Sequence, residues 1–132
     1  MTGIDRIKSF VQSTLGCSCP EDVFEFIESK DKIEVTNKIT LSTKINVGNR
    51  LLIYVIESTD PDFITDNMAG IVMLGKSERD TFGFNRFRLV VVTDDTPDLK
   101  KLTENTFNNL DLQDDKIHLH IINQNDYQQL NN

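Results

Sequence analysis

Two apolar runs constrain the fold of this chain more than any other feature. Residues 51–56 read Leu-Leu-Ile-Tyr-Val-Ile, and a second run extends from Phe87 to Val92 with Arg88 near its start. Both have the length of a strand, and a run without polar alternation is typical of a strand that is buried on both faces. Strands of this kind need covering layers on both sides, so they predict a three-layer α/β domain.

Helical patterns separate these strands. Asp60 and Pro61 begin a segment whose apolar residues recur at helical spacing, and Thr96 and Pro97 open another that continues to about Leu110. A third strand is expected over residues 117–122. The order strand, helix, strand, helix, strand over residues 51–122 implies right-handed parallel crossovers, and hence a parallel β-α-β-α-β core.

Upstream of this core the hydrophobic period is two. Ile33, Val35, Ile39, Leu41, Ile45 and Val47 occupy odd positions, and polar residues such as Thr40 and Lys44 occupy even ones. The pattern predicts a half-exposed antiparallel strand, or two short strands that break near Asn37. An antiparallel edge strand at about residues 39–47 would make the sheet mixed.

The first 30 residues show two amphipathic stretches on either side of a bend. Thr2 and Asp5 have the spacing of a capping box, and Gly16 is placed to end a first helix. Pro20 suits the first turn of a second helix. We expect an N-terminal helical hairpin over residues 2–30 that packs across one face of the sheet.

Composition limits the classes of partner. The 132 residues suit one domain, residues 1–132, and 14 basic against 21 acidic side chains give a net charge of −7. These counts argue against a nucleic-acid backbone or an anionic membrane as the main partner. The sequence shows no secretory or membrane-spanning pattern, so a cytoplasmic protein is expected, with another protein as a candidate partner.

The only two cysteines lie in one short segment, Cys17-Ser18-Cys19-Pro20. A helix start favours thiolate, so the pair could serve redox exchange, metal binding or cofactor attachment. The alternative is that Cys17 packs as a small hydrophobic residue and Cys19 precedes Pro20 at a bend. The acids Glu21 and Asp22 raise the pKa of a nearby thiol and favour this second interpretation.

His118 and His120 are the only histidines, and on a strand they point to the same side. Together with Cys17 and Cys19 they would complete the ligand set of a tetrahedral zinc site. The alternative is a pair of solvent-facing histidines on an edge strand.

Acidic residues follow the two buried strands. Glu57 and Asp60 come after the first, and Asp94 and Asp95 come after the second. Ligands of open α/β sheets collect beyond the carboxyl ends of parallel strands, so these residues could form an acidic pocket for Mg²⁺ or a small ligand. The alternative is helix capping.

No motif identifies a reaction or a cofactor. Neither histidine lies near a nucleophile elbow, and no Gly-rich phosphate loop follows a strand. The residues therefore favour a non-catalytic module that binds a protein or another ligand. A redox or metal site at the cysteines and a Mg²⁺ or small-ligand site at the acidic strand ends are the alternatives.

Overall fold

A computed structural model describes residues 3–16, 21–93, 96–112 and 114–131. Its centre is a five-stranded mixed sheet with the spatial order β1-β2-β3-β4-β5. The pairs β1–β2 and β2–β3 are antiparallel, and the pairs β3–β4 and β4–β5 are parallel, as the sequence predicts for residues 51–122. The strands are β1 Ile27–Glu34, β2 Thr40–Val47, β3 Leu51–Glu57, β4 Arg86–Val92 and β5 Ile117–Ile122.

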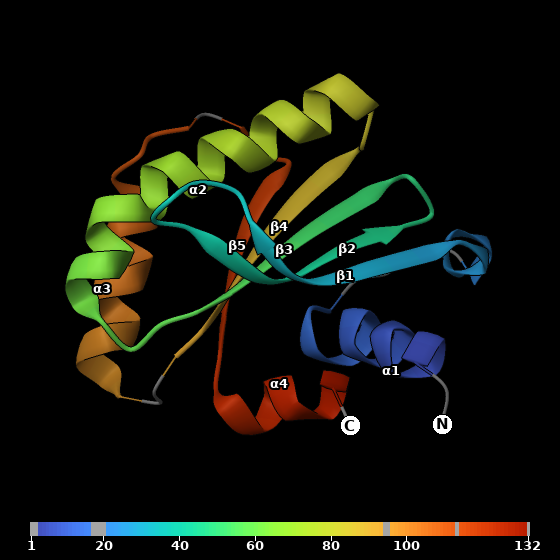
Figure 1. Cartoon of the computed structure of the whole chain (residues 1–132), viewed down its shortest axis with the longest axis horizontal. Helices are drawn as coiled ribbons and strands as arrows, with labels where there is room; N and C mark the ends of the chain where they lie inside the picture. Colours follow the sequence, from blue (N-terminus) through green and yellow to red (C-terminus); the bar gives the residue numbers. More distant parts are fainter. Residues whose placement is uncertain (1–2, 17–20, 94–95, 113, 132) are drawn as a thin grey trace.

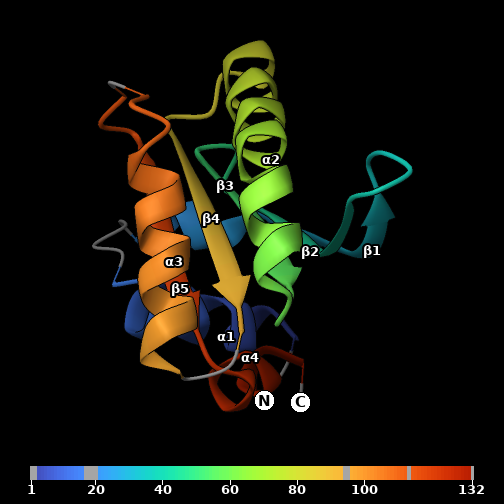
Figure 2. The same ribbon diagram turned by 90° about the vertical axis from the view of Figure 1, so that its left-hand side faces the viewer.

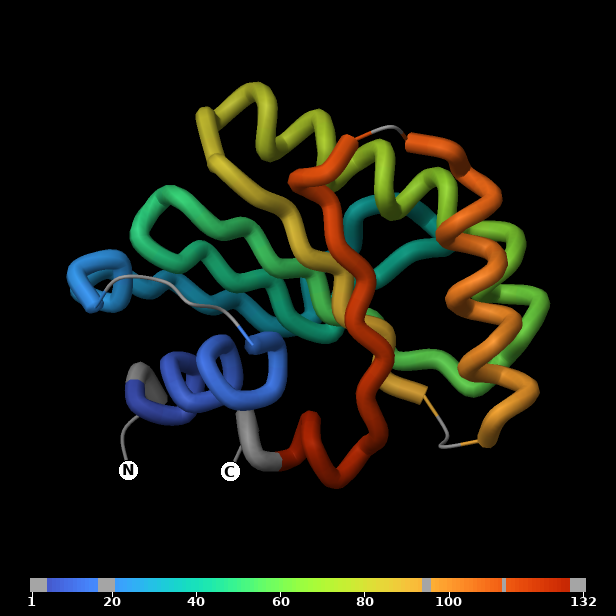
Figure 3. Tube along the Cα trace, turned by 180° about the vertical axis from the view of Figure 1, so that it is seen from behind, coloured from blue at the N-terminus to red at the C-terminus, as the bar shows by residue number. Residues whose placement is uncertain are grey.

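Helices cover both faces of the sheet and complete the three layers (Figure 1). The two long helices α2, Pro61–Phe82, and α3, Pro97–Asn108, lie side by side on one face (Figure 2). On the other face, α1 packs against α4 (Figure 3). The elements of this second layer are α1 Gly3–Ser9, the π-helical turn η1 Phe10–Thr14 and α4 Gln124–Asn131.

Alternate residues of the central strands supply two separate cores. Leu52 and Leu89 pack beneath α2 and α3, whereas Ile53 and Val90 belong to the core beneath α1 and α4. All four side chains are fully buried, which explains why the two runs carry no apolar–polar alternation. The sheet therefore divides the interior into two layers of side chains.

The long helix α2 begins and ends at residues with the expected chemistry. Asp60 is its N-cap and accepts a hydrogen bond from the backbone N–H of Asp62 at 3.0 Å, and Pro61 occupies the first turn. Gly83 ends the helix with a φ of 76°, which a residue without Cβ adopts readily. Within the helix, Gly75 lies directly against the ring of Phe87.

The region before β3 differs in detail from the expected hairpin and edge strand. The antiparallel strand expected at about 39–47 is present as β2, but β1 lies outside it and forms the edge. The pattern over 33–47 thus follows the interpretation of two strands with a break near Asn37. The second helix is reduced to the 3₁₀ segment η2, Glu21–Glu25, because residues 27–31 pair with β2 instead.

Candidate functional site

Four nitrogen-bearing side chains gather on one face of the sheet. Arg86 and Arg88 alternate on β4, and His118 and His120 alternate on β5, the neighbouring strand. Val90 packs toward α1 and α4, Arg86 and Arg88 share its side of β4, and the pairing of Val90 with His120 places both histidines on that same face. We call these residues the Arg–His cluster.

Hydrogen bonds hold the cluster in place. Arg88 Nη1 donates to the backbone carbonyl of Leu15 at 2.9 Å, and the same nitrogen lies 2.8 Å from Nε2 of His120. Arg86 Nη1 lies 3.5 Å from Nε2 of His118. Because a guanidinium only donates, Nε2 of His120 accepts, which places the proton of that ring on Nδ1. Leu15, which follows η1, thus meets residues of β4 and β5 at Arg88.

Burial and the arginines together keep the imidazoles neutral. Burial is the main cause that lowers the pKa of His120 to about 4, and Arg88 adds to this effect. The pKa of His118 is lowered by burial, then by Arg88 and Arg86, and Asp115 and Asp114 oppose the shift more weakly. At neutral pH the positive charge of the cluster therefore resides on its two guanidinium groups.

Among the described residues, neither the exposed Arg86 nor the half-buried Arg88 has a carboxylate partner of the kind that the buried Arg79 has. Arg79 on α2 bridges Asp80 at 2.9 Å and Asp114 at 2.7 Å, and these carboxylates raise its pKa. Across the described part of the chain, no carboxylate lies within 4.0 Å of Arg86 or Arg88. The Arg88 side chain is half-buried, and its Nε is buried with no hydrogen-bond partner there.

Burial next to Arg86 lowers the pKa of Arg88, because the charged form loses solvation and repels its neighbour. This repulsion opposes folding, although the chain has 21 acidic side chains that could have supplied a counter-charge. A negatively charged group beside the two guanidinium groups would offset this repulsion. The cluster is therefore chemically suited to an anion.

The proposed joint zinc site is only partly described. His118 and His120 share a face, but each Nε2 lies against a guanidinium, and a metal ion there would meet two positive charges. Cys17 and Cys19 lie outside the described residues. Within the described residues, no group of three or more His, Cys, Asp or Glu side chains could hold a metal ion. The site that joins these four residues stays a prediction.

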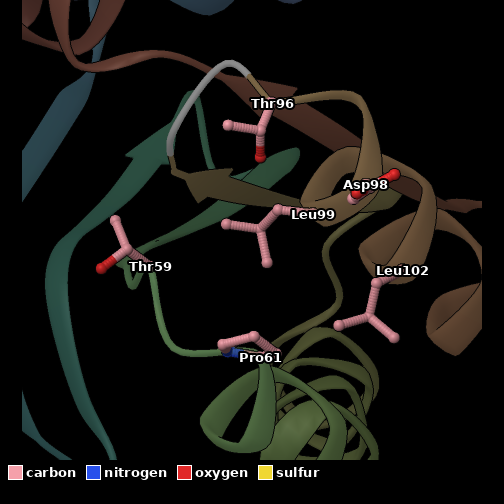
Figure 4. Close-up of a pocket in the computed structure, with 6 residues that line it drawn as sticks. All are labelled: Thr59, Pro61, Thr96, Asp98, Leu99 and Leu102. Atoms are coloured by element: carbon pink, nitrogen blue, oxygen red, sulfur yellow. The ribbon is translucent and has the colours of Figure 1, made fainter.

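A small cavity lies near the start of α2, the helix that Asp60 caps. Asp60 caps α2, and Glu57 accepts a 3.4 Å hydrogen bond from Gln124 Nε2; Asp94 and Asp95 lie outside the described residues. A cavity of about 330 Å³ opens between the starts of α2 and α3 (Figure 4). Its lining is mixed rather than acidic, and consists of Thr59, Pro61, Thr96, Asp98, Leu99 and Leu102. The acidic pocket also stays a prediction.

The sequence did not single out Arg86 and Arg88 as site residues. The sequence does carry a signal within each strand, since the two arginines are two residues apart on one strand and the two histidines are two residues apart on the next, so each pair shares a face. What the sequence alone does not specify is the register, which sets Arg88 opposite His118.

Comparisons with family models, with curated proteins and with solved structures found no match to this chain. Among the described helices, none has the length and apolar character needed to cross a membrane. The functional argument therefore depends on the geometry of the site.

Proposed function

We propose that this chain is a non-catalytic binding module that recognises an anionic group, a carboxylate or a phosphate, at the Arg–His cluster. One observation carries the proposal. Arg86 and Arg88 lie together on a half-covered sheet face, and no carboxylate of the described residues neutralises them. Guanidinium groups are the side chains best suited to carboxylate and phosphate, because their planar donors match two oxygens at once.

The surroundings prepare the cluster for such a ligand. The carbonyl of Leu15 and Nε2 of His120 hold Arg88 in one position, so less side-chain freedom is lost when an anion binds. Neutral His120 carries its proton on Nδ1, so it offers one N–H donor in addition to those of the guanidinium groups. Partial burial strengthens each of these interactions relative to bulk water.

The charge of the whole protein restricts the size of the ligand. A net charge of −7 repels polyanions at long range, so attraction is confined to the immediate surroundings of the two arginines. This favours one or two anionic groups at the cluster over the continuous backbone of a nucleic acid, which many basic side chains would have to follow.

Titration with inorganic phosphate and with N-acetylglutamate, followed by amide chemical shifts, tests the proposal. We expect saturable shifts centred on β4 and β5. Arg88→Gln should weaken binding by about tenfold, the scale of one lost charge-assisted hydrogen bond. Lys101→Gln on α3 is the matched control, since it removes the same charge from an exposed residue on the opposite layer, and it should change the affinity less than twofold.

The proposal fails if neither anion produces saturable shifts at these strands. It also fails if Arg88→Gln and Lys101→Gln weaken binding equally, because the effect would then come from net charge alone.

A further inference from the structure

The two edges of the sheet differ in how they are protected. β1 carries exposed charged side chains of both signs, and Lys32 within it has a φ of 54°, which interrupts regular strand geometry. Both features prevent another strand from pairing there. β5 reads Ile-His-Leu-His-Ile-Ile and has no lysine, arginine, carboxylate or proline. The β5 edge therefore lacks the features that keep an edge strand unpaired.

The hydrogen-bond pattern shows which backbone groups of β5 face outward. The N–H of Phe87 donates to the carbonyl of Lys116, and the N–H of Thr93 donates to the carbonyl of Ile122. Even-numbered residues of β5 thus face β4. Since the N–H and C=O of one strand residue point to the same side, those of Leu119 and Ile121 point away from the sheet. Within the described residues they have no backbone partner.

The free edge and the Arg–His cluster belong to the same strand. His118 and His120 project from β5 onto the face that carries the two arginines of β4. In Figure 3, β5 crosses the front of the molecule, and no other part of the chain is drawn in front of it. A strand placed against β5 would set alternate side chains about 5 Å from the two histidines, on the arginine face.

We infer that the anionic ligand is an acidic segment of another protein, which adds to the sheet as an extended strand along β5. This inference rests on the proposed function, because it requires the arginines to bind carboxylates. Backbone groups of Leu119 and Ile121 bind the main chain of the segment, and its alternate Glu or Asp side chains reach toward Arg86 and Arg88. Main-chain pairing supplies affinity, and the arginines select the acidic side chains.

Charge favours an acidic segment of another protein over a second copy of this chain at the β5 edge. A second copy of this chain could offer its own β5 to the edge, but that strand has no carboxylate and would leave both arginines without a counter-ion. An acidic segment from a different protein supplies the missing charge, so it fits the edge better than a second copy does.

A substitution at the outward-facing position separates the edge from the cluster. Leu119→Pro removes an N–H that is not used by β4, a place where an edge strand tolerates proline. Leu119→Ala is the matched control, since it removes the same partly buried side chain and keeps the N–H. The probe is a fluorescent heptapeptide, Val-Glu-Val-Glu-Val-Glu-Val, blocked at both ends, and anisotropy measures its binding to the full chain.

We expect Leu119→Pro to bind this peptide about tenfold more weakly than Leu119→Ala does, and to bind inorganic phosphate equally well. A peptide with Lys in place of Glu should not bind. Equal peptide affinity for the two variants overturns the edge inference, while retained phosphate binding keeps the proposed function. If the unsubstituted protein binds neither phosphate nor the peptide, both proposals are overturned.

Methylated peptides give a second test that does not depend on the fold of a variant. One peptide is N-methylated on its valines and another on its glutamates, so each blocks one edge of the same strand. We expect one of the two to lose binding and the other to keep it. Equal affinity for both overturns strand addition. A dimer of the unsubstituted protein in sedimentation velocity that Leu119→Pro dissociates also overturns it, because the edge would then bind a second copy.

Discussion

The hydroxyl oxygens of Thr43 and Tyr127 lie 2.7 Å apart in a buried hydrogen bond that joins β2 to α4. Thr43 also donates to Asp31 on β1 at 3.2 Å, so the tyrosine hydroxyl is the donor in the first bond. Three elements are linked in this way beneath the α1–α4 layer. The polar chain crosses a region that is otherwise lined by apolar side chains.

Removal of this hydroxyl tests how far the link stabilises the fold. We expect Tyr127→Phe to lower the free energy of unfolding by about 1 kcal/mol, the usual net contribution of such a bond. Thr43→Val should cost about 1–3 kcal/mol, because it leaves the buried tyrosine hydroxyl without its partner. Urea denaturation measures both, and the double variant should cost less than the sum. Strict additivity would show that the two hydroxyls do not interact.

Replacement of glycine by alanine should change stability in opposite directions at two positions of α2. A Cβ at Gly75 would lie 2.1 Å from Cζ of Phe87, whose ring is fully buried and packs edge-on against Tyr54. We expect Gly75→Ala to destabilise the protein by about 2–3 kcal/mol through overpacking. Thermal or urea unfolding gives the value.

Gly70→Ala is the control on the same helix. The nearest atom to its Cβ would be Cδ1 of Ile39 at 3.8 Å, an ordinary contact, so helix propensity should stabilise the variant by about 0.5–1 kcal/mol. If both variants shift stability in the same direction, the packing of α2 on Phe87 is not as described.

His120 predicts a specific dependence of stability on pH. Its pKa is lowered to about 4 in the folded protein, against an ordinary value near 6.5, so protonation favours the unfolded chain. The neutral ring contributes fully to the free energy of unfolding above about pH 6.5, and this contribution is lost as the pH falls toward 4. Because the ring is partly exposed, we expect a loss of about 1–2 kcal/mol.

The measurement compares the unsubstituted protein with His120→Gln, whose amide oxygen can still accept from Arg88. Urea unfolding at pH 7.5 and at pH 4.5 should show a larger decrease for the unsubstituted protein, and the difference between the two is the contribution of His120. Carboxylates titrate in both proteins and cancel. Equal decreases would mean that the His120 ring is not buried against Arg88.

The core of the fold was predictable because its signals are local. The strand at residues 51–56 is apolar at every position, and proline at the first turn marks the starts of both α2 and α3. The second N-terminal helix was predicted too long because Val23, Phe24 and Ile27 fit a helical face. Pairing of Ile27 with Val47 determined the outcome, and such long-range pairing has no local signal.

The site was harder to predict than the fold for the same reason. His118 and His120 could be placed on one side of a strand from their spacing alone. Their contacts with Arg86 and Arg88 depend on the register between two strands separated by a helix. The bond from Arg88 to Leu15 depends further on how the first helix packs across the sheet. Each step adds a tertiary contact that a single sequence does not encode locally.

The packing of α1 against α4 also has a consequence for folding during synthesis. A ribosome releases the first helix long before residue 127, which supplies the buried tyrosine of that layer. The helices α2 and α3 can cover their face as they emerge, and α1 and η1 supply Ile7 and Phe10 to the opposite face, but that layer is complete only when Tyr127 follows. We expect the incomplete layer to be the part of the nascent chain that a chaperone binds.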